Sequence, residues 1–116
     1  MDEDLQIKAV EGGADTMILR LKGRLDDRGS PLLLDRCGAA RAAGLHVILN
    51  LSQVSFVSSA GIGAFLSLTE DFRDRGLMLS LVSVTQTVLL AIALLNLDSF
   101  LSIHKTEQDA FGARAA

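Results

Sequence analysis

Two adjacent serines, Ser58 and Ser59, are the side chains of this sequence that are best placed to do chemistry. The apolar run before them indicates a buried strand that ends at Asn50-Leu51, and a short loop then leads to the serines, where a helix begins. The free backbone N–H groups of a first helical turn bind a hydroxyl and favour an anion. A serine here is therefore either the N-cap of the helix or a phosphate acceptor that changes a binding surface.

Other reactions find little support in the sequence. A serine hydrolase needs a base close to its nucleophile, but His46 and His104 lie at strand ends remote from the serines, and neither serine stands in a Gly-x-Ser-x-Gly turn. Gly61-x-Gly63 begins like a dinucleotide-binding motif, but Leu66 takes the place of its third glycine. The two glycines instead indicate close packing of a helix start, or an open first turn that a partner can approach. We predict no catalytic residues, no metal and no cofactor.

Composition and charge further limit the domain organisation, the partners and the location that the sequence allows. The 116 residues suit one domain, 1–116, with a core over about 5–111 and frayed ends at 1–4 and 112–116. The net charge of −3 disfavours nucleic acid as a partner. A lone Cys37, predicted to be a core residue, and the lack of a signal-peptide pattern favour a cytoplasmic location. Residues 77–97 are uncharged, but their polar centre predicts a strand and a separate helix rather than a membrane span.

Hydrophobic periodicity predicts strands and helices in alternation after an opening hairpin. The first helix begins at an N-cap, Ser30, with Pro31 after it, and turns Leu33, Leu34, Cys37 and Ala40 to the core. The predicted strands are Leu5–Val10, Thr16–Leu21 (closed by Lys22-Gly23), His46–Leu51, Met78–Val82 and Phe100–Ile103; the predicted helices are 30–43, 59–75, 86–95 and 106–111. This order predicts an α/β fold: a mixed, mostly parallel sheet of four to five strands, an N-terminal β-hairpin and about four helices.

Three segments together resemble the STAS domain of anti-sigma factor antagonists: Gly23-Arg24-Leu25-Asp26, the run from Val47 to Gly63, and Leu97-Asp98-Ser99-Phe100. The resemblance implies a bacterial, non-enzymatic regulator of transcription. It would bind an anti-sigma factor with a serine-kinase fold, and phosphorylation would end the binding in a partner-switching pathway. A serine phosphatase would reverse the modification.

The resemblance also assigns residues. The phosphate acceptor falls on Ser59, with Ser58 as second choice, and Asp26 matches an acidic residue close to the acceptor. Asn50 and Ser58 stand where the family usually has aspartate, which predicts less negative charge beside the acceptor. The predicted partner-binding residues are Asp26, Asn50, Ser52, Ser58, Ser59, Gly61, Gly63 and Ser67.

The predicted helix over 86–95 is apolar all round. Val88, Ala91, Ile92 and Leu95 would form its inner side, while the remaining positions, Leu89, Leu90, Ala93 and Leu94, would form a second interface unless the terminal helix covers them. This surface motivates an alternative function, a constitutive STAS scaffold that docks on a membrane transporter or a signalling assembly without a phosphate switch. Any membrane contact would then run through the partner protein. The sequence leaves homodimerisation open.

Overall fold

The computed structural model describes residues 4–115. Its elements in chain order are β1 (Gln6–Glu11), β2 (Thr16–Leu25), α1 (Ser30–Ala42), β3 (His46–Val57), α2 (Ser59–Asp74), β4 (Leu79–Val82), α3 (Gln86–Leu94), β5 (Ser102–His104) and α4 (Glu107–Ala115). The described chain therefore has the predicted element order. It confirms the α/β class and the mixed, mostly parallel sheet.

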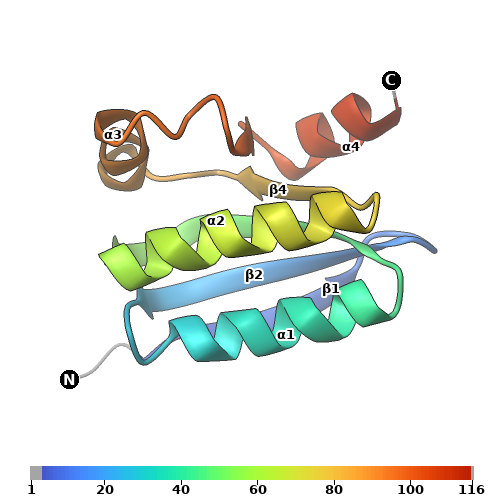
Figure 1. Ribbon diagram of the computed structural model, residues 1–116, viewed down its shortest axis with the longest axis horizontal. Coiled ribbons are helices and arrows are strands. Elements are labelled where there is room, and N and C mark those ends of the chain that lie inside the picture. Colours follow the sequence, from blue (N-terminus) through green and yellow to red (C-terminus); the bar gives the residue numbers. More distant parts are fainter. Residues whose placement is uncertain (1–3, 116) are drawn as a thin grey trace.

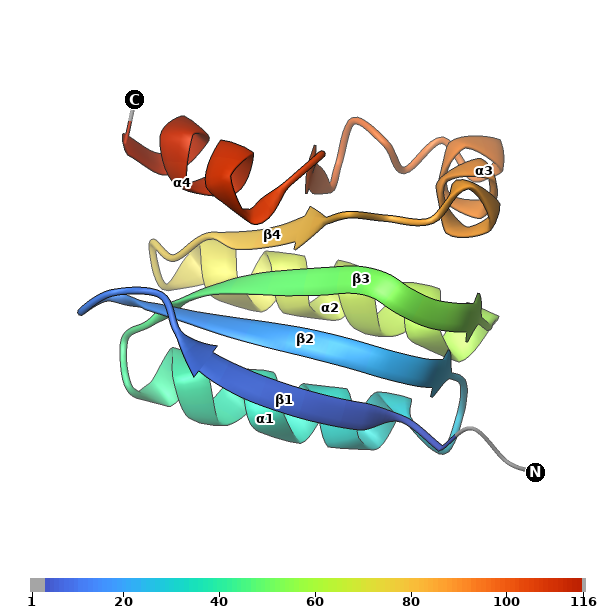
Figure 2. The same ribbon diagram turned by 180° about the vertical axis from the view of Figure 1, so that it is seen from behind.

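The sheet has the strand order β1-β2-β3-β4-β5. β1 and β2 form the antiparallel hairpin, and every later pair is parallel, because each crossover passes through a helix. α1 and α2 cover one face of the sheet (Figure 1). From behind, the opposite face is bare over β1 and β2, while α4 and α3 lie along the β4 side (Figure 2).

Alternating side chains of β2 and β3 build two apolar clusters of unequal size. The larger cluster lies under α1 and α2, where Leu21 and Leu49 of the sheet meet Phe65 and Phe72 of α2. Cys37 of α1 is fully buried in it, and burial raises the pKa of its thiol to about 12. The smaller cluster lies on the opposite face, where α4 covers the sheet; its members are Ile18, Ile48, Val82 and Ala110, with Val10 and Phe111 against them.

The two central strands are longer than predicted. β2 does not close at Lys22-Gly23 but continues to Leu25, and β3 runs past Leu51 to Val57, where we predicted a loop. The register between the two strands shifts twice, and Gly23 adopts a φ of 108° at one of these irregularities. The extra residue of each shift lies in β3, opposite β2. Gly23, in a conformation that other residues rarely adopt, allows β2 to follow the bulged partner strand and continue rather than end.

Two helix boundaries also differ from the prediction. Gly29 rather than Ser30 is the N-cap of α1, and the Ser30 hydroxyl donates to the carbonyl of Asp26 at 2.7 Å. Leu34, predicted to face the core, is 38% exposed. At the other end α4 continues to Ala115, beyond the predicted end at Phe111. The frayed chain ends stay a prediction, and residues 1–3 and 116 lie outside the described residues.

The uncharged stretch 77–97 divides as predicted into a strand and a helix. β4 has four residues and α3 has nine. Within residues 4–115, none of the helices combines the length and the apolar character that a membrane span requires.

Candidate partner-binding site

Ser58 joins the end of β3 to the start of α2. Its backbone N–H donates to the carbonyl of Leu25 at 3.0 Å, which ties it to the end of β2. Its Oγ accepts a long hydrogen bond from Gly61 N at 3.4 Å and donates a weak one to Leu25 O at 3.5 Å. With an extended backbone conformation, Ser58 is the N-cap of α2.

Ser59 is the first residue of α2 and is exposed. Across residues 4–115 the structure contains no hydrogen bond that engages its hydroxyl. The first turn of α2, which is fully described, also lacks an acidic residue, so no carboxylate of that turn neutralises the partial positive charge of the helix start. The sequence leaves open whether a serine here is an N-cap or a phosphate acceptor. In the structure Ser58 caps the helix, and the Ser59 hydroxyl faces solvent at a position that favours an anion.

The two glycines of the first turns have opposite surroundings. A Cβ on Gly61 would lie 2.7 Å from the carbonyl oxygen of Leu25 and 2.8 Å from a methyl group of Val57, whereas a Cβ on Gly63 would meet nothing within 4 Å. Gly61 therefore permits α2 to approach the ends of β2 and β3, and Gly63 leaves the outer side of the helix open.

Asp26 lies next to this helix start, directly after Leu25. One of its carboxylate oxygens accepts the backbone N–H groups of Arg28 at 3.1 Å and Gly29 at 3.0 Å, which closes the turn into α1. These bonds, that from Gly29 foremost, hold the pKa of Asp26 below its ordinary value. Arg24 lies 3.6 Å from the other oxygen. Asp26 therefore presents a fixed negative charge beside the end of β2.

Asn50 and Ser52 lie elsewhere, which corrects the predicted surface. Both stand within β3, and the eight residue steps from Asn50 to Ser58 span up to about 26 Å of extended chain. The interpretation that Asn50 lowers the negative charge beside the acceptor is therefore wrong. Its amide instead donates to Glu107 of α4 at 2.8 Å and accepts the N–H of Ser52 at 3.0 Å.

The outer side of α2 continues the surface of Ser59. Gly63 and Ser67 are both exposed and lie one and two helical turns beyond it. Ile62, Phe65, Thr69 and Phe72 are buried as predicted, while Leu66 is only half-buried. The structure thus brings together Asp26, Ser58, Ser59, Gly61, Gly63 and Ser67, and places Asn50 and Ser52 apart from them.

α3 lies at the same end of the sheet as the start of α2 (Figures 1 and 2). Its buried side consists of Val88 and Ile92. Leu90 is 54% and Leu94 is 81% exposed, Ala93 is exposed, Leu89 is half-buried, and Leu95, predicted to face inward, is 57% exposed. α4 packs over the sheet beside β3, β4 and β5, so the alternative in which the terminal helix covers these leucines is wrong.

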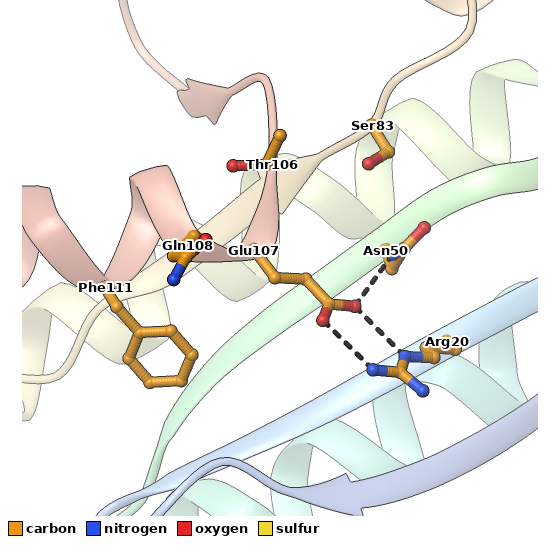
Figure 3. A pocket seen from close by; sticks show the side chains of 7 residues that line it. All are labelled: Arg20, Asn50, Ser83, Thr106, Glu107, Gln108 and Phe111. Carbon is orange, nitrogen blue, oxygen red and sulfur yellow. Dashed lines mark hydrogen bonds and ion pairs between the residues drawn. The ribbon is translucent and has the colours of Figure 1, made fainter.

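Sequence reasoning missed a polar cluster on the face away from α1 and α2. Arg20 of β2 donates through Nε and Nη2 to the two carboxylate oxygens of Glu107, each at 3.0 Å, and Asn50 adds a third bond (Figure 3). The Arg20 hydrogen bond is the main cause that lowers the pKa of Glu107. The available signal was the alternation of Arg20, Lys22 and Arg24, which places three cations on one side of a strand.

Each histidine lies at the end of a strand: His46 begins β3 and His104 ends β5. His46 Nδ1 accepts the backbone N–H of Met78 at 3.0 Å, next to the pairing of β3 with β4. Among the side chains of the described residues, no group of three or more His, Cys, Asp or Glu is arranged to hold a metal ion.

Comparison with known proteins gives one family. The family model of the STAS domain matches residues 7–110. Among solved structures, the chain is similar to the anti-sigma factor antagonist SpoIIAA in its unphosphorylated form, with 20% identity, a TM-score of 0.80 and coverage of 96% of this chain and 98% of that chain. It is also similar to the phosphorylated form of the Bacillus cell fate determinant SpoIIAA, with 19% identity, a TM-score of 0.72 and coverage of 93% and 98%.

A third similar structure belongs to a much longer protein. It is the murine Slc26a9 anion transporter in its inward-facing state, with 19% identity and a TM-score of 0.74. The match covers 98% of this chain but 22% of the transporter. The same fold therefore occurs both as a small separate chain and as a part of a membrane protein.

Proposed function

This chain belongs to the STAS domain family, and we propose that it is a bacterial anti-sigma factor antagonist, a non-enzymatic binding module that regulates transcription. Its partner is an anti-sigma factor with a serine-kinase fold, and phosphorylation of Ser59 ends the complex. The observation that carries the proposal is the exposed hydroxyl of Ser59 at the start of α2, beside a neighbouring serine that already caps the helix. SpoIIAA, which shares the fold, has been solved in unphosphorylated and phosphorylated forms.

The docking surface combines Asp26, Ser58 and Ser59 with the outer side of α2 at Gly63 and Ser67. A kinase active site needs an accessible hydroxyl at a fixed position, and the Ser58 N-cap holds Ser59 in place without engaging its oxygen. Gly61 is buried and allows the start of α2 to pack closely against Leu25 and Val57. Asn50 and Ser52 do not belong to this docking surface.

The switch follows from electrostatics. A phosphate adds a charge of about −1.5 to −2, which the N-terminus of α2 tolerates within its own fold. Asp26 already places a carboxylate beside the end of β2, so the modified surface holds two anionic groups. When a partner excludes water from this surface without a matching cation, the desolvation of the dianion opposes binding. The free domain stays folded while the complex dissociates.

The test measures binding of the cognate kinase-type anti-sigma factor to the wild type, Ser59→Ala and Ser59→Asp. We expect Ser59→Ala to bind. Ser59→Asp should lose at least about tenfold in affinity, which corresponds to about 1.4 kcal/mol of binding free energy. Ser99→Asp, an exposed serine between α3 and β5, is the matched control for an added charge. Equal affinity of the two Ser59 variants excludes the switch.

A kinase assay assigns the acceptor. After incubation with the partner and ATP, mass spectrometry should find phosphate on the wild type and on Ser58→Ala but not on Ser59→Ala. Phosphate on Ser59→Ala would move the acceptor to Ser58. A serine phosphatase should then restore binding of the phosphorylated wild type.

A second candidate function is a constitutive scaffold on a membrane transporter or signalling assembly. The exposed leucines of α3, Leu90 and Leu94, favour it, as does the presence of this fold within the Slc26a9 transporter. Copurification with a membrane protein that Leu90→Glu abolishes and Ser59→Asp leaves intact would support the scaffold. The reverse pattern would support the phosphate switch.

A further inference from the structure

The bare face of the sheet displays a row of cations. Lys8 of β1 and Arg20 and Lys22 of β2 are exposed and alternate with residues such as Leu19 and Leu21, which belong to the core under α1 and α2. Neither α1 nor α2 lies on this side of β1 and β2 (Figure 2). We call Lys8, Arg20 and Lys22 the basic sheet face.

The placement of these charges is unfavourable for the free protein. Lys8 lies directly opposite Arg20 in the antiparallel register, and like charges at opposed positions destabilise a sheet. Glu107 offsets the charge of Arg20. In the part of the chain that the structure describes, no carboxylate forms an ion pair with Lys8 or Lys22, although the chain as a whole has a net charge of −3. Lys8 and Lys22, which are unpaired among the described residues and lie beside another cation, therefore indicate a surface that binds an anionic partner.

The surface around the cations is hollowed. A hollow of about 460 Å³ is lined by Lys8, Arg20 and Lys22, together with the polar residues Gln6, Ser52 and Gln53. It adjoins a second hollow of about 550 Å³, since Arg20 and Asn50 line both. At this junction the carboxylate of Glu107 is held by three hydrogen bonds (Figure 3), which shows how the groove binds a carboxylate.

The spacing of the cations selects the shape of the ligand. Lys8 and Lys22 are diagonal neighbours on adjacent strands, because Lys22 pairs with Gln6 and Lys8 pairs with Arg20, which places them about 7–8 Å apart. Acidic side chains at every second position of an extended peptide repeat at a similar distance, about 6.6 Å. The hollow beside Arg20 and Glu107 is open, and the one lined by Lys8 and Lys22 is only partly enclosed, unlike the clefts that bury most of a small molecule. Three cations are also few for nucleic acid, whose affinity depends on the neutralisation of many phosphates.

We propose that the basic sheet face binds an extended acidic segment of another protein, with carboxylates at alternate positions against Lys8 and Lys22. The segment crosses the β1–β2 pair obliquely and passes beside the Arg20–Glu107 pair. This surface is on the opposite side of the sheet from α2, so it is independent of the proposed switch at Ser59.

The probe is a short fluorescein-labelled peptide of alternating glutamate and serine, measured by fluorescence anisotropy at about 0.1 M salt. The double variant Lys8→Glu/Lys22→Glu should weaken binding at least about tenfold, because attraction becomes repulsion at two positions. The matched control is Arg36→Glu/Arg75→Glu, which changes the net charge equally at exposed sites on and after the helices. It should leave the affinity within about twofold, since charges farther away than about 10 Å are screened.

Three results would overturn the proposal: equal weakening by both double variants, equal affinity for a peptide with its glutamates in one block, or tighter binding to single-stranded oligonucleotide or anionic vesicles. A milder single variant separates a loss of binding from a loss of folding. Lys8→Gln should weaken peptide binding without lowering Tm, because it removes the repulsion from Arg20. A lowered Tm would contradict the view that Lys8 is retained for binding.

Discussion

Replacement of Gly61 by alanine should destabilise the protein by about 2 kcal/mol. The added methyl group would stand 2.7 Å from Leu25 O and 2.8 Å from Val57 Cγ1, where ordinary contacts begin at 3.4 Å. Insertion of a methyl group into such a site costs about 1–3 kcal/mol. The carbonyl of Leu25 cannot withdraw freely, because it also accepts the Ser58 N–H at 3.0 Å, and the loss of that bond adds about 1 kcal/mol. The helical preference of alanine over glycine offsets about 1 kcal/mol of this destabilisation.

Gly63→Ala is the matched control, two residues farther along the same helix. Its methyl group meets nothing within 4 Å, so only the helical preference acts and the variant should gain about 0.5–1 kcal/mol. The chain has no Trp or Tyr, so urea and thermal unfolding are followed by far-UV circular dichroism. At about 4 °C per kcal/mol, Tm should fall by about 8 °C for Gly61→Ala and rise by about 2–4 °C for Gly63→Ala. Equal Tm values for the two variants would refute the reasoning.

Three further predictions concern stability. Ser58→Ala should cost about 0.5–1 kcal/mol through loss of the N-cap, since the bond to Gly61 N is long. Ser59→Ala should change the free energy of unfolding in urea by less than about 0.5 kcal/mol. Phe72→Ala should cost about 3–5 kcal/mol, because the ring is fully buried. The lowered pKa of Glu107 means that its ion pair stabilises the fold above the ordinary pKa and is lost as pH falls through the lowered value. An acid titration should therefore show less loss of stability for Glu107→Gln than for the wild type.

The results that would contradict these predictions differ. A larger effect at Ser59 than at Ser58 would reverse the assignment of the cap. A loss below about 1 kcal/mol at Phe72 would mean that the core under α2 is looser than described. Parallel acid curves for Glu107→Gln and the wild type would mean that the contact of α4 with Arg20 contributes nothing.

Local patterns predicted the order of the elements correctly. Alternation in β2 and the helical periodicity of α2 are strong signals, and Ile62, Phe65 and Phe72 are buried where the period places them. The end of β2 was mispredicted at Gly23, because glycine is favoured both in a turn and in a strand bulge, and only the register against β3 separates the two.

The serine pair shows what a single sequence does not contain. Ser58 and Ser59 are chemically identical, and which of them caps the helix depends on the path of β3, whose last residue is Val57. The long strand also explains the error at Asn50. A predicted loop would have kept it near the serines, whereas an extended strand carries it to the contact with α4.

The basic sheet face escaped prediction for a related reason. Lys8 and Arg20 are twelve residues apart in the chain and become neighbours only through the hairpin register. The sequence shows that Arg20 and Lys22 share one side of a strand, but it does not show that α1 and α2 both cover the other side. The position of α4, against Ile18 and Ile48, is likewise a property of the assembled sheet.

The hydrogen bond from Ser58 N–H to Leu25 O links positions thirty-three residues apart. A nascent chain that has formed only local turns would lack this tether, and its serines would sample many orientations. Under the function proposed above, recognition by a modifying enzyme would then report on completed folding, because immature molecules would display no correctly aimed hydroxyl. Pairing of β2 with β3 would be a step that every copy completes before Ser59 can be modified.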